Sequence, residues 1–134
     1  MIYRIEDLES LDDALRSCLV AAGVKNTRHL LEKCATEEGR AALARDSGVS
    51  EAKILHCVRV ADLLRVKGVG DGYAGLLLAA DVTGVEALKV ADALALAPRL
   101  AAAKVKVKHV DRLPNVKEIA RWIEDAAALK PLFA

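Results

Sequence analysis

Two closely spaced glycines, Gly68 and Gly70, restrict the fold of this chain more than any other feature of its sequence. They lie in the stretch Val66-Lys67-Gly68-Val69-Gly70-Asp71, between two runs of apolar residues with helical spacing. A helix tolerates two glycines this close together poorly, so they predict a tight turn between two helices. We expect Val69 to point into the core and Ala74 to let the two helices approach closely.

Apolar residues recur at helical spacing along most of the chain. The apolar 54% of the residues is nearly all Ala, Leu and Val, with only 3% aromatic residues, which favours close-packed helices over strands. The fold is therefore predicted to be all-α, a compact multi-helix domain of two similar units and a C-terminal helix. The helix starts that the sequence predicts lie near Thr27, Thr36, Ser50, Val85, Pro98 and Asn115.

An internal repeat links the two halves of the chain. The offset that aligns Ala21-Ala22-Gly23-Val24 with Ala79-Ala80-Asp81-Val82 also aligns Leu30 with Leu88, which favours duplication over chance. A chain of 134 residues has the size of one domain. We predict a single domain over residues 1–134, with repeat unit one at about 5–35, bridging helices at about 36–65, repeat unit two at about 63–95, and a C-terminal segment and helix at about 98–130.

The glycine stretch resembles the helix-hairpin-helix motif of DNA repair and recombination proteins. The matching residues are Val66, Gly68, Val69, Gly70, Ala74 and Leu77. Unshielded amides at the start of the second helix, together with the positive end of its dipole, suit a phosphate oxygen. The candidate contacts here are Arg65, Lys67, Gly68, Val69 and Gly70. The alternative is that the turn is only a compact connection between two helices and binds no ligand. The carboxylate of Asp71 favours this alternative, because it is expected to compete for the same amides.

The first repeat lacks the hairpin glycines, since the offset places Ser10 on Gly68 and Asp12 on Gly70. Glu9, Asp12 and Asp13 make this turn acidic, and such a surface repels DNA. Ser10 with Asp13 predicts a helix cap instead. Proteins that bind duplexes through this motif generally pair two hairpins. In this chain only the hairpin of the second unit remains a candidate.

A second basic feature follows the repeats, where Lys104, Lys106 and Lys108 alternate with Val105 and Val107. In an extended segment the lysines share one face and form a basic strip for phosphates or an acidic partner. The alternative is a solvated edge whose valines pack on the core.

The resemblance extends beyond the hairpin. The stretch at residues 34–40, the helix that leads into Val66, and the closing Arg112-Leu113-Pro114-Asn115-Val116 together resemble a bacterial family of tandem helix-hairpin-helix domains catalogued as a domain of unknown function. The resemblance covers nearly the whole chain and implies a helical fold with a conjectured nucleic-acid association. It implies no catalytic residues. Typical members carry a glycine hairpin in the first unit also, and this sequence departs from them at Ser10 and Asp12.

Charge and cysteine content limit the choice of partner and compartment. The net charge is +1, from 20 basic and 19 acidic side chains, so nucleic-acid binding is expected to be weak or confined to one patch. Cys18, Cys34 and Cys57 form no close pair and predict reduced thiols, with Cys34 the most exposed. No apolar run approaches the roughly 20 residues of a membrane span. We expect a cytoplasmic protein of bacterial type.

Two functional hypotheses follow. The first is a non-enzymatic binding module that contacts a nucleic-acid backbone without sequence specificity. The second is a protein-interaction or scaffold module, self-association included, that keeps the fold but not DNA binding. His29, His56 and His109 lack metal-ligand spacing, and no catalytic constellation is visible. We therefore predict no enzyme activity, no metal and no cofactor.

Overall fold

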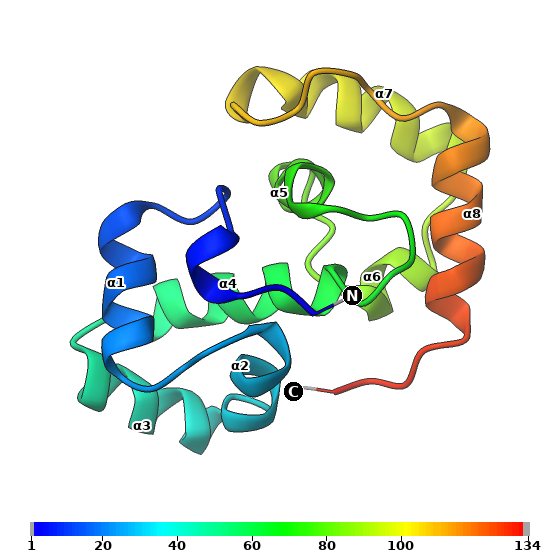
Figure 1. Cartoon of the computed structure of the whole chain (residues 1–134). Helices are drawn as coiled ribbons and strands as arrows, with labels where there is room; N and C mark the ends of the chain where they lie inside the picture. Colours follow the sequence, from blue (N-terminus) through cyan, green and yellow to red (C-terminus); the bar gives the residue numbers. More distant parts are fainter. Residues whose placement is uncertain (1, 133–134) are drawn as a thin grey trace.

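Helices and short connections make up residues 2–132, the part of the chain that the computed structural model describes (Figure 1). Within these residues there are eight α-helices, two short 3-10 helices and no strand, so the all-α prediction is confirmed. In chain order the elements are η1 (Ile5–Asp7), α1 (Asp13–Ala21), α2 (Thr27–Lys33), α3 (Glu37–Ser47), α4 (Glu51–Leu63), α5 (Asp71–Ala79), α6 (Val85–Lys89), α7 (Ala93–Ala103), η2 (Lys104–Lys106) and α8 (Val116–Ala127). None of these helices is long and apolar enough to cross a membrane.

Helix α4 runs through the middle of the molecule, with α1, α2 and α3 (blue to cyan) gathered around its first part and α5 to α8 (green to red) toward its other end (Figure 1). Helices α2, α3 and α5 all pack against α4, and α8 packs against α6 and α7. The buried apolar side chains form a single cluster that includes Leu19 from α1, Ile54 from α4, Leu77 from α5 and Trp122 from α8. The apolar faces of the helices thus share one core.

Short polar side chains begin several helices where the sequence predicts them. The hydroxyl of Thr36 accepts from the Gly39 amide at 3.1 Å, and the hydroxyl of Ser50 accepts from the Lys53 amide at 3.3 Å. Asn115 forms a full capping box with Glu118 at the start of α8. These helix starts are confirmed.

The expected helix start at Pro98 is wrong, because α7 begins at Ala93. The Asp92 carboxylate accepts from the Ala95 amide at 3.0 Å and caps the helix upstream of the proline. Pro98 lies inside α7, where its missing N–H costs the helix one backbone hydrogen bond. Likewise Asn26, rather than Thr27, caps α2, through a 2.8 Å bond from the His29 amide.

The backbone repeats its hydrogen bonds around α1 and α5. Before α1 the Leu11 amide donates to the Leu8 carbonyl at 3.2 Å, and before α5 the Val69 amide donates to the Val66 carbonyl at 3.1 Å. After α1 the amides of Ala22, Gly23 and Val24 donate to the carbonyls of Cys18, Val20 and Leu19, respectively. After α5 the amides of Ala80, Asp81 and Val82 donate to the carbonyls of Leu76, Leu78 and Leu77 in the same way. Gly23 and Asp81 share the left-handed conformation, with φ of +92° and +65°. The two segments therefore share the same pattern of backbone hydrogen bonds at both helix ends, despite different side chains.

The thiols are placed differently from the expectation. Cys34 is fully buried, whereas Cys18 is partly exposed. Cys34 lies at the end of α2, which the start of α3 covers so closely that a side chain on Gly39 would overlap the Lys33 carbonyl. The prediction that Cys34 is the most exposed thiol is wrong, because a helix end that looks open in sequence is closed by the next helix.

Candidate phosphate-binding turn and the adjacent cleft

The connection between α4 and α5, here called the glycine turn (residues 66–70), needs glycine at position 68 for two reasons. Gly68 has φ of +88°, a left-handed conformation that side chains disfavour. A Cβ there would also lie 3.2 Å from Nε1 of Trp122 on α8. Val69 is buried at 3% exposure, as its predicted place in the core requires. Helix α8 and the core thus hold the turn from both sides.

The glycine turn presents the start of α5 with its backbone amides open. Gly70 is the N-cap residue and has no side chain to accept from them. Within residues 2–132 no group accepts a hydrogen bond from the amides of Asp71, Gly72 or Tyr73, the first residues of α5. A hollow of about 280 Å³ lies over this helix start, bordered by the segment at residues 109–112. Unsatisfied amides and the positive helix end favour an anion at such a position.

The carboxylate of Asp71 does not occupy that helix start. Its Oδ2 accepts from the Ser10 amide at 3.1 Å and its Oδ1 accepts from the Ser10 hydroxyl. The expected competition of Asp71 for the α5 amides is therefore not seen. Ser10 also does not cap α1, because Asp12 does so through a 2.7 Å bond from the Leu15 amide. Asp71 instead ties the glycine turn to its counterpart before α1, the serine turn (residues 8–12).

Arg65, a predicted phosphate contact, is engaged within the fold. Its guanidinium lies 2.6 Å from the buried carboxylate of Asp62 and donates to the Lys130 carbonyl at 2.5 Å. Asp62 in turn accepts from the Val85 amide at 2.8 Å, which joins α4 to the start of α6. Lys67, by contrast, is exposed and makes no ion pair within the described residues. Lys67 is therefore the cation of the glycine turn that a ligand can reach.

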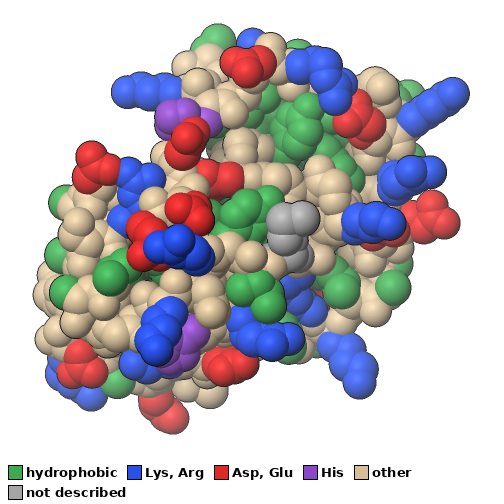
Figure 2. Space-filling model, viewed as in Figure 1, with side chains coloured by type: hydrophobic (Ala, Val, Ile, Leu, Met, Phe, Trp, Pro, Cys, Tyr) green, Lys and Arg blue, Asp and Glu red, His purple; other side chains and the backbone are tan. Residues whose placement is uncertain are grey.

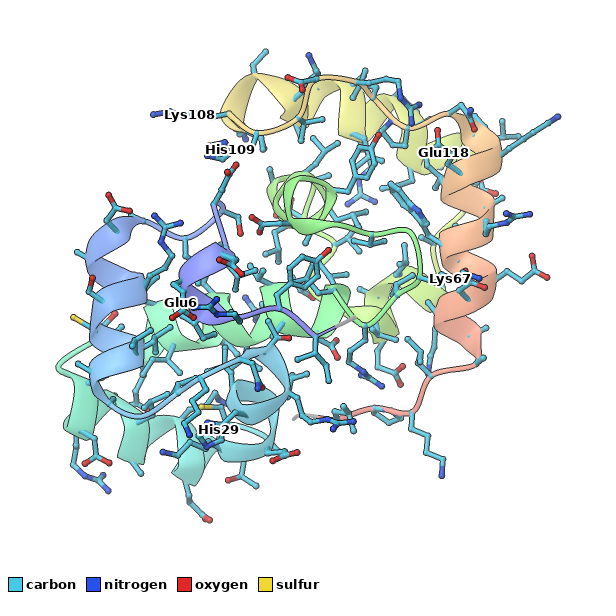
Figure 3. All side chains as sticks on the ribbon, in the orientation of Figure 1. Glu6, His29, Lys67, Lys108, His109 and Glu118 are labelled. Atoms are coloured by element: carbon cyan, nitrogen blue, oxygen red, sulfur yellow. The ribbon has the colours of Figure 1, made fainter. Side chains whose placement is uncertain are left out.

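The predicted lysine strip is not an extended segment, because Lys104–Lys106 form the 3-10 helix η2. Val105 is 89% exposed, while Val107 packs against the core. The expectation that both valines pack inward is wrong for Val105, since the helical turn rotates it outward. Lys67 and Lys108 lie on opposite sides of α5 (Figure 3). The lysine strip and the glycine turn thus do not form one surface.

Lys106 and Lys108 instead line a cleft of about 670 Å³, which Lys104 does not border. The other walls are the serine turn, α4 through His56 and Arg59, and the face of α5 that carries Gly72 and Gly75. Partial desolvation, followed by the nearby charge of Arg59, lowers the pKa of His56, so its imidazole is neutral at neutral pH. Sequence reasoning did not find His56 and Arg59 as members of this site, because nothing in their local pattern shows which segment lies opposite them.

The profile of a protein family described as "Domain of unknown function (DUF4332)" matches residues 9–129. The chain belongs to this family. The DUF4332 match begins within the serine turn and ends after α8, so it includes the glycine turn and every wall of the cleft. No curated protein and no solved structure matches the chain.

Charges of both signs alternate over the surface of this DUF4332 chain. Figure 2 shows Lys and Arg side chains interspersed with Asp and Glu on the face viewed. Five ion pairs join such groups within the described residues, including the Arg112–Glu118 pair at 2.8 Å. In the same part of the chain no group of His, Cys, Asp or Glu is arranged to hold a metal ion. Positive side chains on the face viewed are therefore interspersed with acidic ones and do not gather into one patch.

Proposed function

We propose that this chain is a non-enzymatic module of two helix-hairpin-helix units, whose second hairpin contacts a nucleic-acid backbone phosphate without reading base sequence. The observation that carries the proposal is the start of α5, where Gly70 and the following amides border a hollow and Lys67, three residues before Gly70, is exposed. Backbone amides and one lysine recognise a phosphate and give no base contacts, so the binding is sequence-independent.

The arrangement of the two turns supports this proposal. The serine and glycine turns carry matching backbone hydrogen bonds, as two copies of one hairpin unit do. Only the glycine turn contains a left-handed residue, Gly68, because the φ of its counterpart Ser10 is negative. The hydrogen bonds from Ser10 also draw the Asp71 carboxylate away from the α5 amides. We infer that the serine turn of the first unit stabilises the glycine turn of the second through the hydrogen bonds from Ser10 to Asp71.

A single contacting hairpin and a net charge of +1 give weak binding. Few phosphates are engaged, so few counterions are released when the complex forms. Asp111 also borders the hollow over the start of α5 and reduces its positive potential. We therefore expect dissociation constants in the micromolar range or weaker at low salt.

Fluorescence anisotropy with a short labelled duplex and the corresponding single strand tests the proposal. Lys67→Glu should weaken binding by about tenfold, since it replaces a contacting cation with an anion. Gly70→Glu should abolish binding, because the new carboxylate stands at the helix start. Lys25→Glu makes the same change in charge on an exposed lysine before α2 and serves as the control. Equal weakening by Lys25→Glu and Lys67→Glu would exclude the glycine turn as the site.

A second candidate function is protein interaction without nucleic-acid binding. Val90, directly after α6, and Leu94, in the first turn of α7, favour it, because 86% and 72% of their surfaces are exposed. Exposed apolar side chains of this size occur at contact surfaces. Light scattering would detect self-association, and Leu94→Lys should then abolish it. A monomer at all concentrations would exclude self-association through this surface.

A further inference from the structure

The cleft of about 670 Å³ has the size and the wall structure of a small-molecule site. Clefts of about 300–1,000 Å³ are typical of such sites in proteins. This one is bordered by segments far apart in the sequence, from the serine turn to the residues after η2. Figure 3 shows Lys108 and His109 at the end of that later segment. The cleft adjoins the hollow over the start of α5, because Gly72 and His109 border both, but its other walls are different.

Its cations are not paired within the fold. Arg59, Lys106 and Lys108 line the cleft, and none of them has a carboxylate within ion-pair distance in the described part of the chain. Arg65 and Arg112, outside the cleft, are both paired. Unpaired cations that share a concave wall reinforce one another's potential, because part of the surrounding water is replaced by protein.

The acids of the cleft are mostly engaged. The Glu9 carboxylate lies 3.4 Å from Nδ1 of His109, which also lines the cleft. The Asp12 carboxylate accepts from the Leu15 amide and caps α1. Asp81 is the acidic residue of the wall with no partner among residues 2–132. The lining therefore holds three cations and three carboxylates. Two of the carboxylates have partners within the fold, whereas all three cations are left for an anionic ligand.

The remaining wall is apolar and lacks projecting side chains where α5 forms it. Gly72 is so close to the following segment that a Cβ would overlap the His109 carbonyl oxygen. One turn later Gly75 has Val107 and Ser10 as its nearest neighbours. Leu78 continues the same wall toward the end of α5. Such a surface suits the apolar or ring portion of a ligand, with the cations at the rim for its charged portion.

We propose that this cleft binds a small organic phosphate of mononucleotide size. Arg59, Lys106 and Lys108 hold the phosphate, and the apolar part of the ligand lies against Gly75 and Leu78. The site goes beyond the nucleic-acid contact proposed above, because it shares neither Lys67 nor Gly68 with the glycine turn. Either site can exist without the other.

Titration of the ¹⁵N-labelled protein with AMP, followed by NMR, tests the inference, with adenosine as the probe that lacks a phosphate. AMP at up to about 1 mM should shift the amide signals of Gly75, Lys106 and Lys108 in a saturable way. Adenosine should not. Lys106→Glu and Lys108→Glu should each weaken AMP binding about tenfold, as loss of a charge-assisted contact does.

Two further variants distinguish the cleft from the glycine turn as the place where AMP binds. Lys67→Glu should leave AMP binding unchanged even though it impairs DNA binding, so the two proposals can fail independently. Asp81→Asn should tighten AMP binding about two- to fivefold, because it removes a carboxylate from the wall while asparagine tolerates the φ of +65°. The inference is overturned if AMP leaves the cleft signals unmoved, if it shifts only the glycine turn, or if the lysine variants bind AMP as the wild type does.

Discussion

The carboxylate of Asp71 accepts hydrogen bonds from both the amide and the hydroxyl of Ser10, and it thereby joins the two turns that lie before α1 and α5. The bond from the amide is 3.1 Å long and the contact is partly buried. Asp71 is the first residue of α5, so this link holds the start of that helix against the first half of the chain. The geometry of the proposed phosphate contact therefore depends on the serine turn as well as on the glycines.

Removal of the Asp71 carboxylate should destabilise the protein and loosen the glycine turn. We expect Asp71→Ala to lower the free energy of unfolding by roughly 1–3 kcal/mol, because it leaves the Ser10 amide without its acceptor. Ser10→Ala should cost less, since the amide bond remains. Urea denaturation of both variants and of the double variant measures the coupling. Asp46→Ala is the control, because Asp46 is exposed on α3 and makes no ion pair within the described residues. Purely additive effects of the Ser10 and Asp71 variants would contradict the link.

Two glycines of one helix should respond in opposite ways to the same substitution. Gly75→Ala should stabilise the protein by about 0.5–1 kcal/mol, because its Cβ would have ordinary contacts of 3.7 and 3.8 Å and alanine favours helix. Gly72→Ala should destabilise it by more than about 1 kcal/mol, because its Cβ would overlap the His109 carbonyl oxygen. Thermal denaturation of the pair checks this. If Gly72→Ala were as stable as Gly75→Ala, the close approach of the 107–110 segment to α5 would be refuted.

Acid should weaken the start of α8 through Glu118. Its hydrogen bonds from Arg112 and then from the Asn115 amide lower the pKa of Glu118 from 4.5 to about 2. A carboxyl whose pKa is lowered by folding stabilises the folded state above its unfolded value and loses that contribution as pH falls through the folded value. The stability difference between wild type and Glu118→Gln should therefore be greatest above about pH 5 and vanish toward pH 2. Denaturation curves across this range test the sign, and a difference that is independent of pH would contradict it.

The thiols should react in the order of their exposure. Burial, and secondly the negative charge of a nearby Cys34 thiolate, raises the pKa of Cys57 to about 12. Burial raises the pKa of Cys34 as well. At pH 8 a thiol reagent should label Cys18 quickly, and the two buried thiols only when the protein unfolds. Cys18→Ser should abolish the fast phase. Fast labelling of Cys34 in the native protein would show that α3 does not cover it.

Local sequence signals predicted much of the fold, while contacts between distant segments decided the site. Caps such as Thr36, Ser50 and Asn115 act within three residues of themselves, so the sequence predicted those helix starts correctly. Gly68 and Gly70 predicted the turn for the same reason. The upstream cap at Asp92 was missed because proline is the stronger signal for a helix start.

The errors at the site share a different physical cause. Asp71 was expected to bond to its own helix, yet its partner is Ser10, which no local pattern identifies. The 3-10 turn of η2 rotated Val105 outward and left Lys104 off the cleft that Lys106 and Lys108 line. His56 and Arg59 join that cleft only because α4 lies opposite the lysine segment. Side-chain partners across the fold depend on packing that a single sequence does not display.

The salt dependence of DNA binding tests the central proposal most directly. A protein that engages one or two backbone phosphates should bind a short duplex measurably at about 50 mM salt, with a slope of log K against log salt of about −1 to −2. Gly70→Glu should remove this binding while it leaves the helical circular dichroism spectrum unchanged. If the wild type shows no binding at about 50 mM salt, or if Gly70→Glu binds with the same slope, the glycine turn does not contact a nucleic-acid backbone.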